Sequence, residues 1–172
     1  MAGGLVRDFI WNCLMGSEGF SMPFRICKIF EVESGHMLSK NDDCCGFPHG
    51  HTRRIELILE ADEIDTCQMV CDYRAIKMLM KEYLNTFDHS MCVNTHDPNF
   101  ENLRSLYGER IIPFENMDPT TEVIAKTIYE EVRRRLAEYI RQKSKIYPMQ
   151  NGVRVSRVRV WETSSSWAEY EE

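Results

Sequence analysis

Two segments in which apolar and polar side chains alternate constrain the fold of this 172-residue chain most strongly. Successive side chains of a β-strand point to opposite faces, so each segment presents one apolar face. In "FRICKIFEVE" this face holds Phe24, Ile26, Phe30 and Val32, with Lys28 as the exception, and in "RRIELILE" it holds Ile55, Leu57 and Leu59. Residues 34–51 between them are rich in Gly, Asn, Asp and Pro, which is typical of a loop. We therefore expect two neighbouring antiparallel strands.

Two later segments show helical periodicity. The first follows Asp72, a suitable N-cap, and repeats apolar residues at Tyr73, Ile76, Met80 and Leu84. For the second, Asp118 can act as the cap, Pro119 suits the first turn, and Glu122 favours the positive end of the helix. Its buried stripe is predicted to be Ile124, Ile128, Val132, Leu136 and Ile140. Residues 88–117, before the second helix, are predicted to be irregular.

The C-terminal segment "VRVSRVRVWET" predicts a strand whose phase changes once. Val153 and Val155 share one parity, whereas Val158 and Val160 share the other. One extra residue near Ser156 and Arg157 reconciles the two halves, so we expect a β-bulge there. A short last strand is predicted around residues 167–170.

The predicted order is therefore ββααββ, an α+β fold with an antiparallel sheet and two helices packed on one face. We expect a single domain over residues 23–172, preceded by an N-terminal extension over residues 1–22 with one short helix. The apolar part of that extension is interrupted by Arg7 and Asp8 and is too short to span a bilayer.

Charge and cysteine content narrow the possible environments and partners. The net charge of −6 argues against a general nucleic-acid binder, because such proteins need a surplus of basic residues. Seven cysteines without a regular spacing favour free thiols in a reducing compartment. We expect a cytoplasmic protein that binds neither nucleic acid nor membrane.

Three histidines form a candidate metal site. His49 and His51 stand two apart at the start of the second strand, so both imidazoles face one side. His36 ends the facing strand, where antiparallel pairing brings it alongside. Three imidazoles and one open position are typical of a catalytic zinc. Two alternatives remain open: polar loop histidines without metal, and a closed structural zinc site that uses Cys44 or Cys45.

Four other residues are candidates for acid–base chemistry and ligand binding. Cys45 precedes His49 by four residues, and a nearby cation would favour its thiolate. Asp88 and His89 are adjacent, and such an aspartate can orient the imidazole in a proton relay. Glu162 ends the last long strand and can bind a ring with paired N–H donors. Packing of the thiol and solvent exposure of the carboxylate are the competing interpretations.

Taken in order, these motifs resemble the family of 6-pyruvoyl-tetrahydropterin and 6-carboxytetrahydropterin synthases. The resemblance covers residues 24–170 and rests on "SGH", "CGFPHGH", "MVCDY", "FDH", "PTTE" and "ET". It implies a tunnelling fold (T-fold) whose subunits assemble into a hexamer of two trimers, with active sites between subunits.

The resemblance also implies roles for individual residues. His36, His49 and His51 would bind a catalytic Zn²⁺, and Cys45, Asp88 and His89 would transfer protons. Glu162 would anchor the pterin ring, and Thr121 and Glu122 match a stretch close to it. The doubled cysteine leaves open whether Cys44 competes with Cys45.

The implied substrate is 7,8-dihydroneopterin triphosphate. As the resemblance has it, three residues between the cysteine and the HGH motif mark the 6-carboxytetrahydropterin synthases of queuosine biosynthesis, whereas five mark the pyruvoyl-forming enzymes. Three residues separate Cys45 from His49. The expected activity is therefore a zinc-dependent lyase that releases 6-carboxytetrahydropterin, acetaldehyde and triphosphate. The pyruvoyl synthase and a non-catalytic zinc-binding module are the alternatives.

Overall fold

The computed structural model describes residues 22–143 and 146–172 of the chain. The helix predicted before residue 22 lies outside these residues. The strands are β1 (Phe24–His36), β2 (His49–Ala61), β3 (Ser90–Asn94), β4 (Ile111–Phe114), β5 (Arg154–Trp161) and β6 (Trp167–Glu171). The α-helices are α2 (Tyr73–Asn85), α3 (Phe100–Tyr107) and α4 (Thr121–Gln142), with 3₁₀ turns η1 (Cys44–Gly46) and η2 (Gly108–Arg110).

One six-stranded sheet in the order β4-β3-β1-β2-β5-β6 organises the fold. The long strands β1 and β2 pair antiparallel over their full length, from Phe24 opposite Ala61 to His36 opposite His49. This confirms the predicted pairing. Because the register is continuous, the histidines at one end of the pair and the charged residues at the other are fixed relative to one another.

The predicted irregularity in β5 is present. Ile58 of β2 lies opposite Arg157, whereas the next residue, Leu59, lies opposite Val155. Ser156 is therefore the extra residue that lets valines of both parities face the same core. The predicted last strand is β6, which pairs antiparallel with β5.

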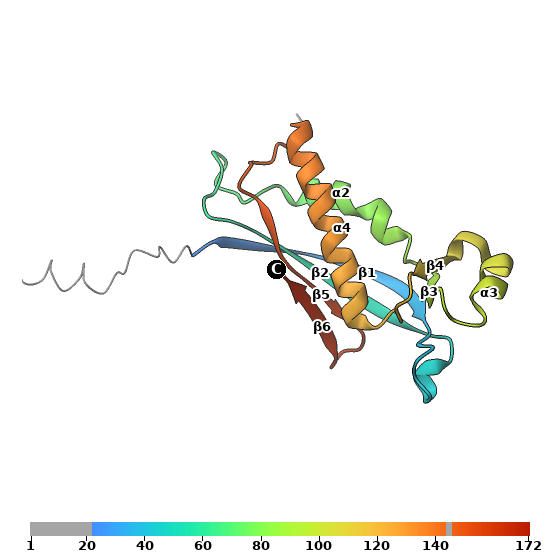
Figure 1. The fold of residues 1–172 in the computed structure, drawn as a ribbon. Helices are drawn as coiled ribbons and strands as arrows, with labels where there is room; N and C mark the ends of the chain where they lie inside the picture. Colours follow the sequence, from blue (N-terminus) through green and yellow to red (C-terminus); the bar gives the residue numbers. More distant parts are fainter. Residues whose placement is uncertain (1–21, 144–145) are drawn as a thin grey trace, which may run out of the picture.

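Helices α2 and α4 cover one face of the sheet, and α3 lies beyond the β3–β4 edge (Figure 1). The core forms between this face and the two helices, where the predicted stripe of α4 is buried at Ile124, Ile128, Val132 and Leu136. Helix α2 begins as predicted, with the Asp72 carboxylate accepting from the Arg74 N–H. No helix among the described residues is long and apolar enough to cross a membrane.

The predicted order ββααββ needs correction between residues 90 and 114. This segment contains the two short strands β3 and β4 and the helix α3, and both strands run parallel to their neighbours. The sheet is therefore mixed, and the described part of the chain has three α-helices where two were predicted. Strands of five and four residues are too short to show alternation clearly, and Pro113 is tolerated because β4 is an edge strand.

The start of α4 also differs from the prediction. Thr120 is the N-cap, its hydroxyl accepting from a first-turn N–H, and Pro119 precedes the helix. The Asp118 carboxylate instead accepts hydrogen bonds from Ser39 Oγ at 2.7 Å and Asn94 Nδ2 at 2.7 Å. Asp118 therefore joins the β1–β2 loop to β3, which is a tertiary role that a local capping pattern does not reveal.

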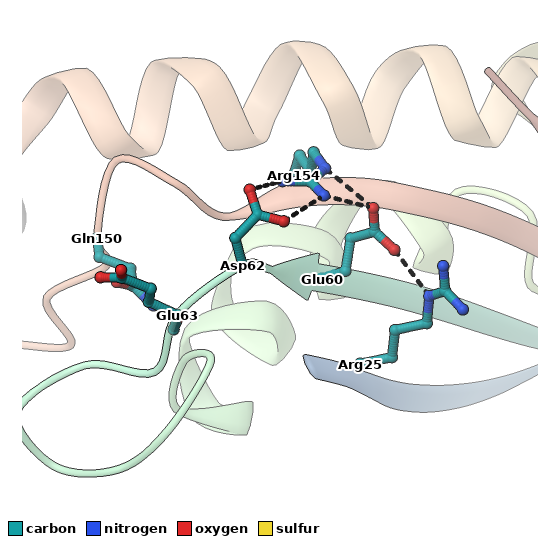
Figure 2. A network of polar contacts seen from close by, with 6 residues as sticks. All are labelled: Arg25, Glu60, Asp62, Glu63, Gln150 and Arg154. Carbon is teal, nitrogen blue, oxygen red and sulfur yellow. Dashed lines mark hydrogen bonds and ion pairs between the residues drawn. The ribbon is translucent and has the colours of Figure 1, made fainter. Parts of the chain in front are cut away.

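A charged network lies at the end of the β1–β2 pair that is remote from the histidines (Figure 2). The Glu60 carboxylate accepts from Arg25 Nε at 2.7 Å and from Arg154 Nε at 2.9 Å. Arg154 also binds Asp62, with 3.1 Å between Nη2 and Oδ1. The network joins β1, β2 and β5 through complementary charges.

Candidate metal centre and active site

The three predicted histidine ligands meet at the end of the β1–β2 pair. His36 and His49 are direct cross-strand partners, and His51 lies opposite Ser34. The ring centroid of His36 is 4.4 Å from that of His49 and 5.2 Å from that of His51. One nitrogen from each ring lies within 4.8 Å of the other two, which is close enough to hold a single ion.

Contacts with backbone carbonyls determine which ring nitrogen of His36 and of His49 can bind a metal. His36 Nδ1 lies 2.8 Å from the Pro119 carbonyl oxygen, and His49 Nδ1 lies 2.8 Å from that of Phe47. A carbonyl only accepts, so each Nδ1 carries the proton and each Nε2 keeps a free lone pair. Such contacts are typical of metal-binding histidines. The buried Nε2 atoms of His36 and His51 have no hydrogen-bond partner, so the donor set fits a divalent metal such as zinc.

The surroundings keep the imidazoles of His36 and His51 neutral. The pKa of His36 is lowered to about 4, mainly by burial and in part by the nearby Arg53 cation. Burial and then Arg53 also lower the pKa of His51. Metal coordination requires the neutral ring, so both histidines are in the binding form at neutral pH without giving up a proton.

The three predicted substrate-binding residues share a cavity with the metal cluster. Thr121, Glu122, Glu162 and His36 line a cavity of about 280 Å³ between the start of α4 and the end of β5. Glu162 Oε1 lies 3.4 Å from His36 Nε2 and 3.5 Å from His51 Nε2. The carboxylate therefore lies beside the candidate metal position and does not point away from it.

Cys45 lies in the η1 turn, four residues before β2 begins at His49. Its side chain is half-buried, and that of Cys44 is exposed. A hydrogen bond with Cys44 raises the pKa of the Cys45 thiol, and the Glu162 carboxylate adds to the effect. In the chain by itself Cys45 is therefore a thiol. All the cysteines in the described ranges are free, as predicted.

Asp88 and His89 interact directly, although adjacent residues need not. His89 Nδ1 lies 3.1 Å from Asp88 Oδ2, and the Glu33 N–H donates to Asp88 Oδ1 at 2.9 Å. The Glu33 and His89 contacts lower the pKa of Asp88, so it stays an anion that can orient the ring. His89 has a left-handed φ of 54°, which turns the chain sharply before β3.

A second and larger cavity, of about 500 Å³, connects this pair to the metal cluster. His89 and His51 both line it, together with Tyr107 and Arg110 from the segment that was predicted to be irregular. The metal cluster consequently stands between two cavities, with His36 on one and His51 on the other.

Arg53 was not among the predicted site residues, yet it is buried, with its side chain 1% exposed. Its Nη1 donates to Thr121 Oγ1 at 3.2 Å, and its Nη2 lies 3.8 Å from Glu162 Oε1. A signal was available, since Arg53 has the same strand parity as Ile55 and Leu57 and must face the core with them. A charged residue in a core-facing position indicates a specific partner.

Comparisons with known proteins identify the family. A family model described as 6-pyruvoyl tetrahydropterin synthase matches residues 25–172. The 6-carboxy-5,6,7,8-tetrahydropterin synthase of Aquifex aeolicus is 29% identical over 170 residues, which cover 88% of this chain and 99% of that protein. The protein of the same name from Rickettsia conorii is 31% identical over 104 residues, covering 59% of this chain and 75% of that one.

Solved structures share the fold. An uncharacterized protein from Wolinella succinogenes superposes with a TM-score of 0.70 at 22% identity, covering 88% of this chain and 99% of that chain. Caenorhabditis elegans 6-pyruvoyl tetrahydropterin synthase gives 0.59 at 19% identity, covering 87% and 96%. The resemblance seen in the sequence motifs is confirmed: the chain belongs to the 6-pyruvoyl tetrahydropterin synthase family.

Proposed function

We propose that this protein is a zinc-dependent lyase that converts 7,8-dihydroneopterin triphosphate into 6-carboxy-5,6,7,8-tetrahydropterin, releasing acetaldehyde and triphosphate. The observation that carries the proposal is the cluster of His36, His49 and His51, in which the buried Nε2 atoms of His36 and His51 have no hydrogen-bond partner and His36 lines a cavity together with Glu162. The names of the curated relatives and the three residues between Cys45 and His49 support the carboxy product.

In this proposal the three histidines hold the metal, and Glu162 binds the paired N–H donors of the pterin ring. Bound zinc would supply Lewis acidity at the side-chain hydroxyls of the substrate and a positive charge that favours the Cys45 thiolate. Cys45 then removes a proton from the substrate side chain. His89 moves a second proton while the Asp88 carboxylate keeps its ring oriented.

We also propose that the protein assembles into a hexamer whose active sites lie between subunits. Glu162 and His36 line one cavity, whereas His89 lines the other. A hexamer with sites between subunits, as the family resemblance implies, would let His89 of one subunit serve the metal centre of its neighbour. The reaction would then supply the carboxylated pterin used in queuosine biosynthesis.

The alternative product is 6-pyruvoyl-tetrahydropterin. It is favoured by the description of the matching family model and by the name of the structural relative from Caenorhabditis elegans. Both products share the substrate, the metal and the first proton transfers, so they differ in the fate of the side chain.

The test is turnover of the zinc-loaded protein with 7,8-dihydroneopterin triphosphate, with products separated by mass and the chelator-treated protein as control. We expect 6-carboxytetrahydropterin and acetaldehyde in equal amounts, and neither product after chelation. The pyruvoyl product would assign the alternative reaction. Tightly bound zinc without either product would contradict both synthase activities and leave a non-catalytic zinc-binding module.

A further inference from the structure

Arg53 is a buried cation whose contacts connect two residues of the proposed pterin site. It follows His51 by two residues on β2, so both side chains are on the face covered by α4. Nη1 donates to Thr121 Oγ1 at 3.2 Å, and Nη2 lies 3.8 Å from Glu162 Oε1. Thr121 begins α4 and Glu162 follows β5, so one guanidinium group spans two separate elements.

The Arg53 guanidinium is incompletely satisfied. Its Nε and Nη2 atoms are buried without a hydrogen-bond partner. Burying a charged group is costly unless it is paired and hydrogen-bonded. An incompletely bonded guanidinium is therefore a poor stabilising element by itself. Its two contacts, Thr121 and Glu162, both line the smaller cavity, which points to a role for Arg53 at that cavity.

One oxygen of the Glu162 carboxylate, Oε1, is the atom closest to both histidines and to Arg53. Glu162 Oε1 lies 3.4 Å from His36 Nε2, 3.5 Å from His51 Nε2 and 3.8 Å from Arg53 Nη2. The cation attracts Oε1 towards the protein interior. A carboxylate held by one oxygen presents the other oxygen in a defined direction.

We propose that Arg53 is a positioning residue for recognition of the pterin ring. It holds Glu162 through Oε1 and fixes the Thr121 hydroxyl beside it, so that the carboxylate meets the paired N–H donors of the ring in one orientation. The planar guanidinium can serve two acceptors at once, whereas a lysine ammonium is a single point charge. This inference rests on the proposed function, because it gives Glu162 its ring-binding role.

The proposal predicts an effect on ring selectivity and not merely on stability. The probes are 6-carboxypterin and 6-carboxylumazine, which differ in that the lumazine has a carbonyl in place of the 2-amino group. A carboxylate fixed against paired donors disfavours the carbonyl, which repels it. We expect the zinc-loaded protein to bind the pterin at least about tenfold more tightly, the range for one lost or unsatisfied buried hydrogen bond.

The experiment measures dissociation constants of both probes by fluorescence titration for wild type, Arg53→Met, Arg53→Lys and the control Arg154→Met. Arg154 belongs to the charged network at the other end of the β1–β2 pair. We expect Arg53→Met to reduce the preference for the pterin over the lumazine below about threefold, because the hydrogen bonds between Glu162 and the ring are then no longer directed. The zinc content should stay unchanged. Arg53→Lys should recover only part of the ratio, and Arg154→Met should keep the wild-type ratio.

A double variant separates positioning from general disruption. Glu162→Gln should itself lower the ratio, and adding Arg53→Met should change it by less than about twofold, since residues that act as one unit are not additive. A wild-type selectivity ratio in Arg53→Met, or in Arg53→Lys, would overturn the inference and leave the proposed function standing. If wild type binds neither probe, the proposed function fails and the inference fails with it. If Arg53→Met does not fold, Arg53→Lys decides by the same ratio.

Discussion

The β1–β2 pair carries a polar cluster at each end, and the two clusters differ in how their charges are satisfied. At the Phe24 end, Glu60 accepts from two arginines at 2.7 Å and 2.9 Å (Figure 2). At the His36 end, buried Nε2 atoms of two histidines and two nitrogens of Arg53 have no hydrogen-bond partner. The same two strands thus support one complete network and one incomplete one.

We interpret the difference as a separation between residues that stabilise the fold and residues that we propose to bind a ligand. Most buried polar groups of native proteins are hydrogen-bonded, so each exception needs an explanation. The Glu60 carboxylate is completed by its two arginines and needs no ligand. Under the proposed function, a cation bound to the Nε2 atoms would complete the histidines of this cluster, and the pterin ring would bind Glu162. Mutations at the two ends should therefore have different consequences.

The largest effect is expected from His51→Ala. Loss of one of three ligands should lower zinc affinity and kcat/KM by more than about 100-fold, because even the outer partners of metal ligands contribute 10–100-fold. Zinc content after dialysis and steady-state kinetics measure this. His96→Ala, in the loop after β3, is the matched control and should retain zinc and activity. Full zinc occupancy in His51→Ala would contradict the assigned ligand set.

Cys45→Ala should have the next largest effect. Removing a proton-transfer group costs roughly 10²–10⁴-fold in turnover, while zinc binding should stay intact because the histidines hold the metal. The neighbouring Cys44→Ala provides the comparison, since the side chain of Cys44 is exposed. Near wild-type turnover in Cys44→Ala assigns the proton transfer to Cys45. Equal losses in both variants would show that the two thiols share the role.

Glu60→Gln should have the smallest effect, and on stability alone. Arg25 and Arg154 have side chains 60% and 46% exposed, so solvent screening limits the expected loss to about 1 kcal/mol in the free energy of unfolding at pH 7. Urea unfolding measures the loss. Zinc content and turnover should not change, and a loss of activity would break the contrast between the two ends.

The pH dependence of this loss sharpens the same prediction. Burial raises the pKa of Glu60, but hydrogen bonds from Arg25, Ser156 and Arg154 outweigh it, so the pKa is lowered on folding. The stabilisation is then present above the unfolded pKa, about 4.3, and is lost as the pH falls through the folded value. The gap between wild type and Glu60→Gln should close between pH 5 and the lower folded pKa. A constant gap would show that the charge of Glu60 is not responsible.

Strong local patterns made much of the fold predictable. Alternation gave β1 and β2, the parity change at Ser156 gave the bulge, and helical spacing gave α2 and α4. Strands β3 and β4 were not predictable, because they are short and are stabilised by parallel pairing with residues distant in sequence. The cap of α4 was wrong because Asp118 satisfies long-range donors instead.

The candidate site was predictable to the extent that its residues fall in short motifs. The positions of His36, His49 and His51 follow from strand pairing alone. Arg53 was missed because a charged residue is normally assigned to the surface, although its parity placed it in the core. The partition into two cavities depends on α3 and β4, which local patterns did not reveal.

The coordination shell of the bound metal tests the central claim most directly. X-ray absorption at the zinc edge of the metal-loaded protein should show three nitrogens at about 2.0–2.1 Å and one oxygen, with no sulfur near 2.3 Å. That result would show three histidine ligands and an open position for substrate, as the incomplete cluster at the His36 end requires. A sulfur ligand from Cys44 or Cys45 would show a closed structural site and contradict the account.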